Sequence, residues 1–329
     1  MKAAVATVSA ASLLTLSACG DGGGNADHPE PDASIVVGVA PDFFFTHLYV
    51  AVQEDFFAAE GIEAELVEFP SGMEATEAIT AGQADITSTT SSTLSLLAGS
   101  GSDVTALASN LVGDGWYGIV ANEEAGDVSD SSDLEGLTLA APHGSVLDMH
   151  VRNFLESHNL SAEDIDYEDV NAAQLVTGLT RGDFDAASMW EPNVSQSLAE
   201  TEGSSVVLDS EETMPVTGYT VGGSDVVEDE ELAVRVLTAL DNAIDWIEEN
   251  PDEVLDLVME NSGIDDESLA QTVQDKVSYR LDFSEEEVDE IYESRDFYES
   301  LGMTDATDDD VTQMYDTSTF EEWNSSGDS

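Results

Sequence analysis

The sequence has very little positive charge and a single cysteine. Its 329 residues contain 7 Lys and Arg against 71 Asp and Glu, which gives a formal net charge of −64. Duplex nucleic acid and anionic lipid surfaces are both bound through Lys and Arg, so the composition argues against either as a partner. The lone Cys19 leaves no intrachain disulfide, no Cys-based zinc site and no redox pair.

The acidic excess bears on the solvent in which the chain folds. Repulsion between surface carboxylates reaches about 10 Å at 0.1 M salt but about 3 Å at 1 M, so concentrated salt relieves it. Hydrophobic residues make up 41% of the chain, and their periodicity, described below, argues against a long acidic disordered region. The composition is therefore typical of a protein from a salt-loving, halophilic organism.

The first twenty residues have the features of an export signal. Lys2 precedes an apolar run, 3–16, that is too short to span a bilayer comfortably. The run leads into Leu-Ser-Ala-Cys19-Gly, which matches the lipobox of exported lipoproteins, whereas the alternative is a plain secretory signal with an incidental cysteine. We expect a signal peptide at 1–18 and a flexible Gly-, Pro- and Asp-rich tether at 19–33. Lipidated Cys19 would then anchor the protein to the outer face of the cytoplasmic membrane, as its only membrane contact.

Two parts of the chain resemble each other at a spacing of about 100 residues. Segment 78–88 shares Thr, Gly, Asp and Ser with segment 178–188 at that shift. Just upstream of each segment a helix-capping pattern begins, at Ser71 and at Asn171. The recurrence indicates two similar structural units.

Each unit also opens on a buried-strand pattern, 35–41 or 137–142, followed by an amphipathic helix. Strand, helix, strand, helix and strand in turn predict a parallel sheet covered by helices. We expect two similar α/β lobes with a ligand cleft between them and a helical C-terminal segment. The expected boundaries are 34–122 plus 220–322 for lobe 1, 123–219 for lobe 2 and 323–329 for a tail.

Ligands of open parallel sheets bind at the carboxyl ends of strands, where helix N-termini face the crevice. The turns at these places are rich in hydroxyl and aromatic side chains and contain no Lys or Arg. Backbone donors and a helix dipole can hold an anion there, and aromatic rings can enclose the rest of a small ligand. The alternatives are an N-cap for the Ser and Thr run and core packing for the aromatic residues. The candidate ligand-binding residues are Phe43, Phe44, Thr46, His47, Ser88, Thr89, Thr90, Ser91, Trp116, Gly144, Ser145, Trp190 and Glu191.

Motifs for catalysis, cofactors and metals are missing. The segment 113–118 fits the dinucleotide string G-x-G-x-x-G, but Ile-Val-Ala follows where a helix would be needed. The sequence has no nucleophile elbow, no P-loop and no His-Glu-x-x-His, and its five histidines are scattered. We expect no enzyme activity, no cofactor and no metal, with a secreted enzyme on the same fold as the alternative.

Four short motifs occur in the order and at the spacing of a known family. They are the Leu-Tyr-Val-Ala-Val run with its Phe-Phe and Glu-Gly-Ile at 48–62, Ala-Gly-Gln-Ala-Asp-Ile at 81–86, Gly-Asp-Phe-Asp-Ala at 182–186 and Trp-Glu-Pro at 190–192. Together they resemble the nitrate, sulfonate and taurine family (NitT/TauT, NMT1-like) of ABC-transporter substrate-binding proteins, over about residues 35–250.

The resemblance implies a type II periplasmic-binding-protein fold, whose lobes close on a ligand and are presented to an ABC transporter permease. It implies a small organic anion or zwitterion, sulfonate-, taurine- or nitrate-like, bound by a monomer. Basic residues near the cleft, common in anion-binding members, have no counterpart at these turns, so Glu191 is a candidate partner for a ligand amine. An aromatic or pyrimidine-type ligand is the alternative, although the Cys-rich motif of the related thiamine-pyrimidine synthase is absent.

Overall fold

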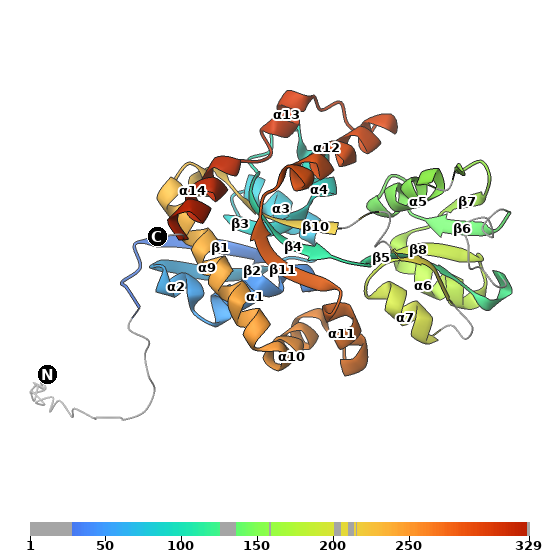
Figure 1. Cartoon of the computed structure of the whole chain (residues 1–329), viewed down its shortest axis with the longest axis horizontal. Helices are drawn as coiled ribbons and strands as arrows, with labels where there is room; N and C mark the ends of the chain where they lie inside the picture. Colours follow the sequence, from blue (N-terminus) through green and yellow to red (C-terminus); the bar gives the residue numbers. More distant parts are fainter. Residues whose placement is uncertain are drawn as a thin grey trace, which may run out of the picture.

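The computed structural model describes residues 28–125, 136–157, 159–200, 205–209, 214 and 216–327. The expected signal peptide and Cys19 lie outside these residues, as does the tether up to residue 27. The described residues form two α/β lobes that lie side by side, a larger one and a smaller one (Figure 1). Among them, no helix combines the length and the apolar character needed to cross a bilayer.

The larger lobe is built on a six-stranded sheet with the order β11-β4-β10-β3-β1-β2. Strand β1 is parallel to both β2 and β3, whereas β10 is antiparallel to β3 and β4. The predicted parallel arrangement therefore holds for the first three strands, and antiparallel strands extend the sheet. The strands are β1 Ala33–Val39, β2 Ile62–Glu68, β3 Ile86–Thr90, β4 Thr105–Gly113, β10 Val216–Gly222 and β11 Val277–Asp282.

Short helices connect the first strands of this lobe. The amphipathic helix expected after β1 is divided in two, because Asp55 adopts a left-handed backbone conformation with φ 60°. The 3-10 turn η1 precedes it and carries three buried phenylalanines. The elements are η1 Phe43–Phe45, α1 Thr46–Gln53, α2 Phe56–Ala59, α3 Gly72–Thr80 and α4 Ser91–Leu97.

The smaller lobe is built on a five-stranded sheet with the order β7-β6-β8-β5-β9. Strand β6 is parallel to β7 and β8, and β5 runs antiparallel to β8 and β9. The predicted strand at 137–142 and its helix are both present, and Leu147, Val151 and Leu155 of that helix are buried. The elements are β5 Tyr117–Ala121, η2 Glu123–Ala125, β6 Thr138–Ala141, α5 Val146–Ser157, β7 Asp166–Asp169, α6 Ala172–Arg181, β8 Ala186–Trp190, α7 Asn193–Glu200 and β9 Ser205–Asp209.

The strands place the lobe boundaries differently from the sequence prediction. Strand β5 pairs within the second sheet, although the boundary expected at residue 122 assigns it to lobe 1. Strand β10 lies wholly in the first sheet, although the boundary expected at residue 219 divides it. The chain crosses between sheets at residues 114–116, and apolar strands on either side of a crossing look alike in sequence, so pairing alone distinguishes them.

The remaining helices follow β10 and cover the larger lobe (Figure 1). Helix α9 buries the predicted apolar stripe, and α10 begins at Pro251 and ends before Gly263, whose φ is 71°. The expected tail from residue 323 is instead the end of α14, because Phe320 and Trp323 form one aromatic pair packed on the core. The helices are α8 Ser224–Val227, α9 Glu230–Glu249, α10 Pro251–Ser262, α11 Glu267–Gln274, α12 Glu285–Ser300, α13 Asp308–Thr312 and α14 Thr317–Gly327.

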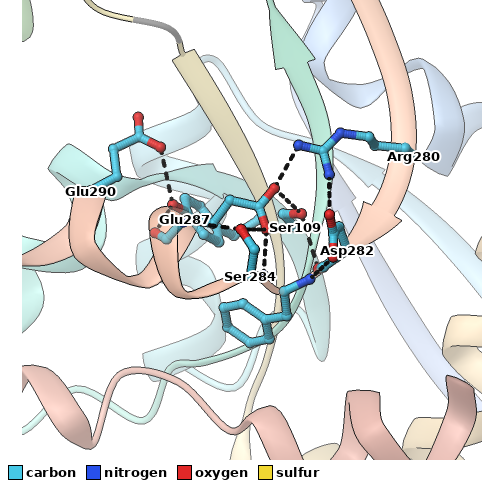
Figure 2. A network of polar contacts seen from close by, with 8 residues as sticks. Ser109, Arg280, Asp282, Ser284, Glu287 and Glu290 are labelled. Carbon is cyan, nitrogen blue, oxygen red and sulfur yellow. Dashed lines mark hydrogen bonds and ion pairs between the residues drawn. The ribbon is translucent and has the colours of Figure 1, made fainter.

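Helix α12 is fixed to the first sheet by a buried carboxylate. The predicted capping box at Ser284 is present: Ser284 N donates to Glu287 Oε2 at 2.8 Å, and Glu287 N donates to Ser284 Oγ at 3.3 Å. Figure 2 shows that Glu287 Oε1 also accepts from Arg280 of β11 and Ser109 of β4, both at 2.8 Å. The helix start is therefore held both by β11, which directly precedes it in the chain, and by β4, which is far from it in sequence.

Candidate ligand-binding site

A cavity of about 170 Å³ lies between the two lobes, with residues of both in its wall. This volume is below the roughly 300–1,000 Å³ of pockets that hold drug-sized ligands, so the cavity suits a small ligand. Six of the predicted residues line it: Phe44, Ser88, Thr89, Thr90, Trp116 and Trp190.

Hydroxyl groups at the end of β3 form one wall of the cavity. Asn110 Nδ2 donates to Ser88 Oγ at 3.0 Å and to Thr220 Oγ1 at 3.1 Å, which uses both amide hydrogens. Ser88 thus serves as an acceptor for the protein, and its own O–H is left to donate to a ligand. Thr90 Oγ1 and Ser92 Oγ lie 2.9 Å apart at the next turn. This wall can donate hydrogen bonds to the oxygens of an acid.

Aromatic rings form another part of the cavity wall. Phe44 of η1 and Trp116, at the crossing between lobes, make an edge-to-face pair with ring centroids 4.9 Å apart. Asp42 caps η1, since its Oδ1 accepts from Phe44 N at 3.0 Å, and Asp42 is also one of the residues that line the cavity. Burial raises the pKa of Asp42, partly offset by the Phe44 amide, which lowers it.

Four predicted residues lie behind these walls, outside the cavity lining. Phe43 and His47 are buried in the core, and the His47 ring lies 5.9 Å from that of Tyr279. Burial lowers the pKa of His47 to about 3. Thr46 Oγ1 donates to Phe43 O at 2.9 Å, and Ser91 Oγ accepts from Ser294 at 3.2 Å. Their polar groups serve the fold.

Gly144 and Ser145 also lie outside the lining, although the neighbouring Val146 is part of it. Gly144 N donates to Asp148 Oδ2 at 2.8 Å, and Ser145 Oγ donates to Pro142 O at 2.6 Å. Ser145 Oγ in turn accepts from Leu147 N at 3.1 Å. These donors at the start of α5 are already used within their own turn.

Glu191 faces an amine of the protein itself. Its fully buried carboxylate pairs with Lys276, which precedes β11 in the larger lobe and also donates to Gly115 O at 3.1 Å. Ser195 donates to the same carboxylate from N and from Oγ, at 3.1 and 3.0 Å. Glu191 does not line the cavity, so its expected contact with a ligand amine has no counterpart here. The ion pair instead connects the two lobes beside the crossing.

Several lining residues were not among the sequence candidates. Asp42 and Tyr117 belong to the turns and aromatic residues that the sequence points to, although they are not in the list of candidates. Val216 had no signal in the sequence, because it reaches the cavity only through the return of β10 to the first sheet. Among the described residues, no group of three or more His, Cys, Asp or Glu side chains could hold a metal ion.

Residues 42–254 match the family described as NMT1/THI5 like, and the chain belongs to that family. It is 25% identical, over 259 residues, to a Bacillus subtilis protein named for binding aliphatic sulfonates, covering 77% of this chain and 76% of that protein.

Solved structures show the same periplasmic-binding-protein fold. The aliphatic sulphonate binding protein SsuA of Escherichia coli superposes with a TM-score of 0.74 at 17% identity, covering 85% of this chain and 91% of that one. The alkanesulfonate-binding protein SsuA of Xanthomonas axonopodis gives a TM-score of 0.65 at 16% identity, covering 84% and 95%.

Proposed function

We propose that this chain is the solute receptor of an ABC importer. It captures a small organic acid of the sulfonate type in the cavity between its lobes and passes it to the membrane permease, with no bond made or broken. The observation that carries the proposal is the shared cavity, to which the larger lobe contributes Ser88 and Thr90 and the smaller lobe contributes Trp190. Sulfonate binding by the named relatives supports the ligand class.

A ligand in this cavity would favour the closed arrangement of the lobes, because only that arrangement brings Trp190 and Val146 of the smaller lobe against a ligand held by the larger lobe. The permease could then distinguish loaded from empty receptor by shape. We further propose that the receptor acts as a monomer outside the cell, anchored through lipidated Cys19, and that its acidic surface is an adaptation to concentrated salt. Nitrate and taurine belong to the same ligand proposal.

The proposal is tested by calorimetry with a panel of alkanesulfonates, taurine and nitrate, in molar salt, on the wild type and two tryptophan variants. Trp190→Ala removes a cavity wall and should weaken sulfonate binding tenfold or more, which is about 1.4 kcal/mol. Trp246→Ala is the matched control, because Trp246 is also half-buried but lies on α9, where it packs against the hydrophobic core and does not line the cavity.

Equal affinities of the two variants would refute the site, and no binding by any sulfonate would refute the ligand class. Recovery of the bound compound unchanged after long incubation would separate a receptor from an enzyme on the same fold.

A further inference from the structure

Helix α12 carries a second carboxylate, that of the half-buried Glu290, one turn after Glu287. Glu287 pairs with Arg280, whereas Glu290 forms no ion pair with any described Lys, Arg or His. Figure 2 shows Glu290 on the side of Glu287 away from Arg280, whose second contact is Asp282. Because a carboxylate shielded from water is costly to keep charged without a partner, this position favours the neutral form of Glu290.

The hydrogen bonds of Tyr219 favour the same form. Tyr219 lies in β10 and is fully buried, and its O–H donates to Glu287 O at 2.7 Å. The same phenol oxygen lies 3.3 Å from Glu290 Oε2. A phenol has one hydrogen to donate, and its oxygen can also accept. An ionised Glu290 therefore competes with Glu287 O for that hydrogen, whereas a protonated Glu290 brings a hydrogen of its own.

Burial raises the pKa of Glu290 to about 7, although hydrogen bonds from Thr217 and Tyr219 lower it in part. Helix α4, which packs along α12, carries no titratable side chain. The titratable groups that face Glu290 are Glu287, Tyr219 and Tyr117, and behind Glu287 lie Arg280 and Asp282. Burial raises the pKa of both tyrosines, so they stay neutral where Glu290 titrates. Glu290 thus changes its charge near neutral pH.

Glu290 does not line the cavity but lies behind its wall, close to both places where the chain crosses between the lobes. One crossing ends at Tyr117, and the other ends at Val216, and both residues line the cavity. Thr217, the neighbour of Val216, hydrogen-bonds with Glu290. The charge of Glu290 raises the pKa of Tyr117, second only to burial. The charge of Glu290 therefore acts on the cavity, and an anion in the cavity acts equally on Glu290.

We propose that capture of an anionic ligand is coupled to the uptake of a proton by Glu290. The proton comes from the solvent and joins the Glu290 carboxylate, no bond of the ligand changes, and release returns the proton. This inference rests on the proposed function, in which the ligand is an acid, and adds a dependence of its affinity on pH. Because a bound anion favours neutral Glu290, affinity is highest in mild acid and falls as pH rises past neutral.

Calorimetry at two pH values tests the coupling. The probe is the sulfonate that binds most tightly in the panel above, because its acid group stays ionised from pH 6 to pH 8. The wild type should bind it about threefold more tightly at pH 6 than at pH 8. Molar salt reduces the screening length to about 3 Å, which suppresses the exposed carboxylates far more than a buried one. Binding heats at pH 7.5 in two buffers of different ionisation enthalpy measure the proton uptake directly.

Glu290→Gln is the decisive variant, because glutamine has the same size, stays neutral and can still hydrogen-bond with Tyr219. Its affinity should equal that of the wild type at pH 6, should not change up to pH 8, and should be accompanied by no proton uptake. Glu293→Gln is the matched control, since Glu293 lies exposed on the same helix. His143→Gln is the second control, because His143 is exposed just before α5 and histidines titrate in this pH range. Both controls should keep the pH dependence of the wild type.

Equal wild-type affinities at the two pH values, or a proton uptake that persists in Glu290→Gln, would overturn the coupling and leave the receptor proposal standing. Loss of the pH dependence in Glu293→Gln or in His143→Gln would also overturn it. The proton uptake of the wild type tests the coupling even if Glu290→Gln fails to fold. Failure of every sulfonate at both pH values would instead refute the proposed function.

Discussion

The two lobes carry the same strand and helix 100 residues apart, and they differ where these elements meet the cavity. Strand β3 covers residues 86–90 and β8 covers residues 186–190. Each pairs with an antiparallel strand from a distant part of the chain: β3 pairs with β10, and β8 pairs with β5. Ser88 and Ser188 occupy matching positions and are both buried. The shared strands therefore fix which positions of each lobe meet the cavity. The residue types at those positions decide which chemical groups line it.

After these strands the lobes diverge. The larger lobe continues with hydroxyls, Thr90 and Ser92, whereas the smaller lobe places an aromatic ring, Trp190, and then the buried Glu191. Glu191 in turn pairs with Lys276 of the larger lobe. The smaller lobe therefore contributes contact area to the cavity and an ion pair to the junction, while the larger lobe contributes hydrogen-bond donors.

The largest expected effect comes from breaking the junction pair. Lys276→Met leaves the fully buried Glu191 carboxylate with only the two Ser195 donors, so the free energy of unfolding should fall by about 3 kcal/mol, at the lower end for broken buried pairs. Urea unfolding at fixed molar salt measures the loss. Adding Glu191→Gln removes the unpaired charge and should restore most of it.

Arg181→Met is the matched control for the loss of a cation. Arg181 and Asp183 are 66% and 61% exposed and lie 3.9 Å apart, so their pair contributes within about 1 kcal/mol. If Lys276→Met lowers the free energy of unfolding no more than Arg181→Met does, the ion pair between Glu191 and Lys276 does not stabilise the junction. The two lobes would then differ only in the residues that they contribute to the cavity.

A second contrast concerns the buried histidines, one in each lobe. His150 Nδ1 lies 3.0 Å from Ser188 Oγ, whereas neither ring nitrogen of His47 has a hydrogen-bond partner among the described residues. An unsatisfied buried polar group costs about 1–3 kcal/mol. We expect His47→Leu to raise the free energy of unfolding by about 1 kcal/mol at neutral pH, and His150→Leu to lower it because Ser188 loses its partner.

The same variants predict a pH dependence. Burial lowers the pKa of His47 to about 3 and of His150 to about 4, from 6.5. As pH falls below about 6.5, these two histidines bind protons in the unfolded chain but stay neutral in the folded lobes. The free energy of unfolding therefore falls with pH. His47→Leu removes one such site, and its stability advantage over the wild type should grow from pH 8 to pH 5. A constant difference across that range would mean that the pKa of His47 is the same in the folded and in the unfolded protein, and would contradict this prediction.

Much of the fold could be predicted because local sequence patterns determine many of its strands and helices. The strands near 35 and 138, the helix with Leu147 and Val151, and the box at Ser284 all follow from periodicity and capping within a few residues. The break at Asp55 was not predicted, because one left-handed residue leaves the apolar spacing unchanged. The assignment of β5 to the second sheet was missed for another reason, since strand pairing is set by distant partners.

The candidate site residues likewise fall into those that local patterns predict correctly and those whose position depends on distant partners. Ser88, Thr90 and Trp190 lie in the last residues of regular strands, next to recognisable turns, and these residues do line the cavity. Glu191 follows its strand just as clearly, but its carboxylate is taken by Lys276, 85 residues away, and no local pattern predicts that pairing. Sequence thus locates the turn, whereas the direction of each side chain depends on partners that only the fold brings near.

The smallest expected effect tests whether the repeated helices are equivalent. Ser71 Oγ accepts from Glu74 N at 3.2 Å at the start of α3, and Asn171 Oδ1 accepts from Ala173 N at 3.0 Å at the start of α6. Both caps are exposed, and loss of such a cap costs about 1 kcal/mol. Ser71→Ala and Asn171→Ala should therefore each lower the free energy of unfolding by about this amount in urea titrations at fixed salt.

Glycine at the same two positions provides the control, since it keeps a permissive cap backbone and should cost only a few tenths of a kcal/mol. A loss confined to Ser71→Ala would mean that the smaller lobe unfolds before the global transition and does not contribute to it. Equal losses would instead show that the two lobes unfold as one unit, which is the behaviour that a buried ion pair across their junction should produce.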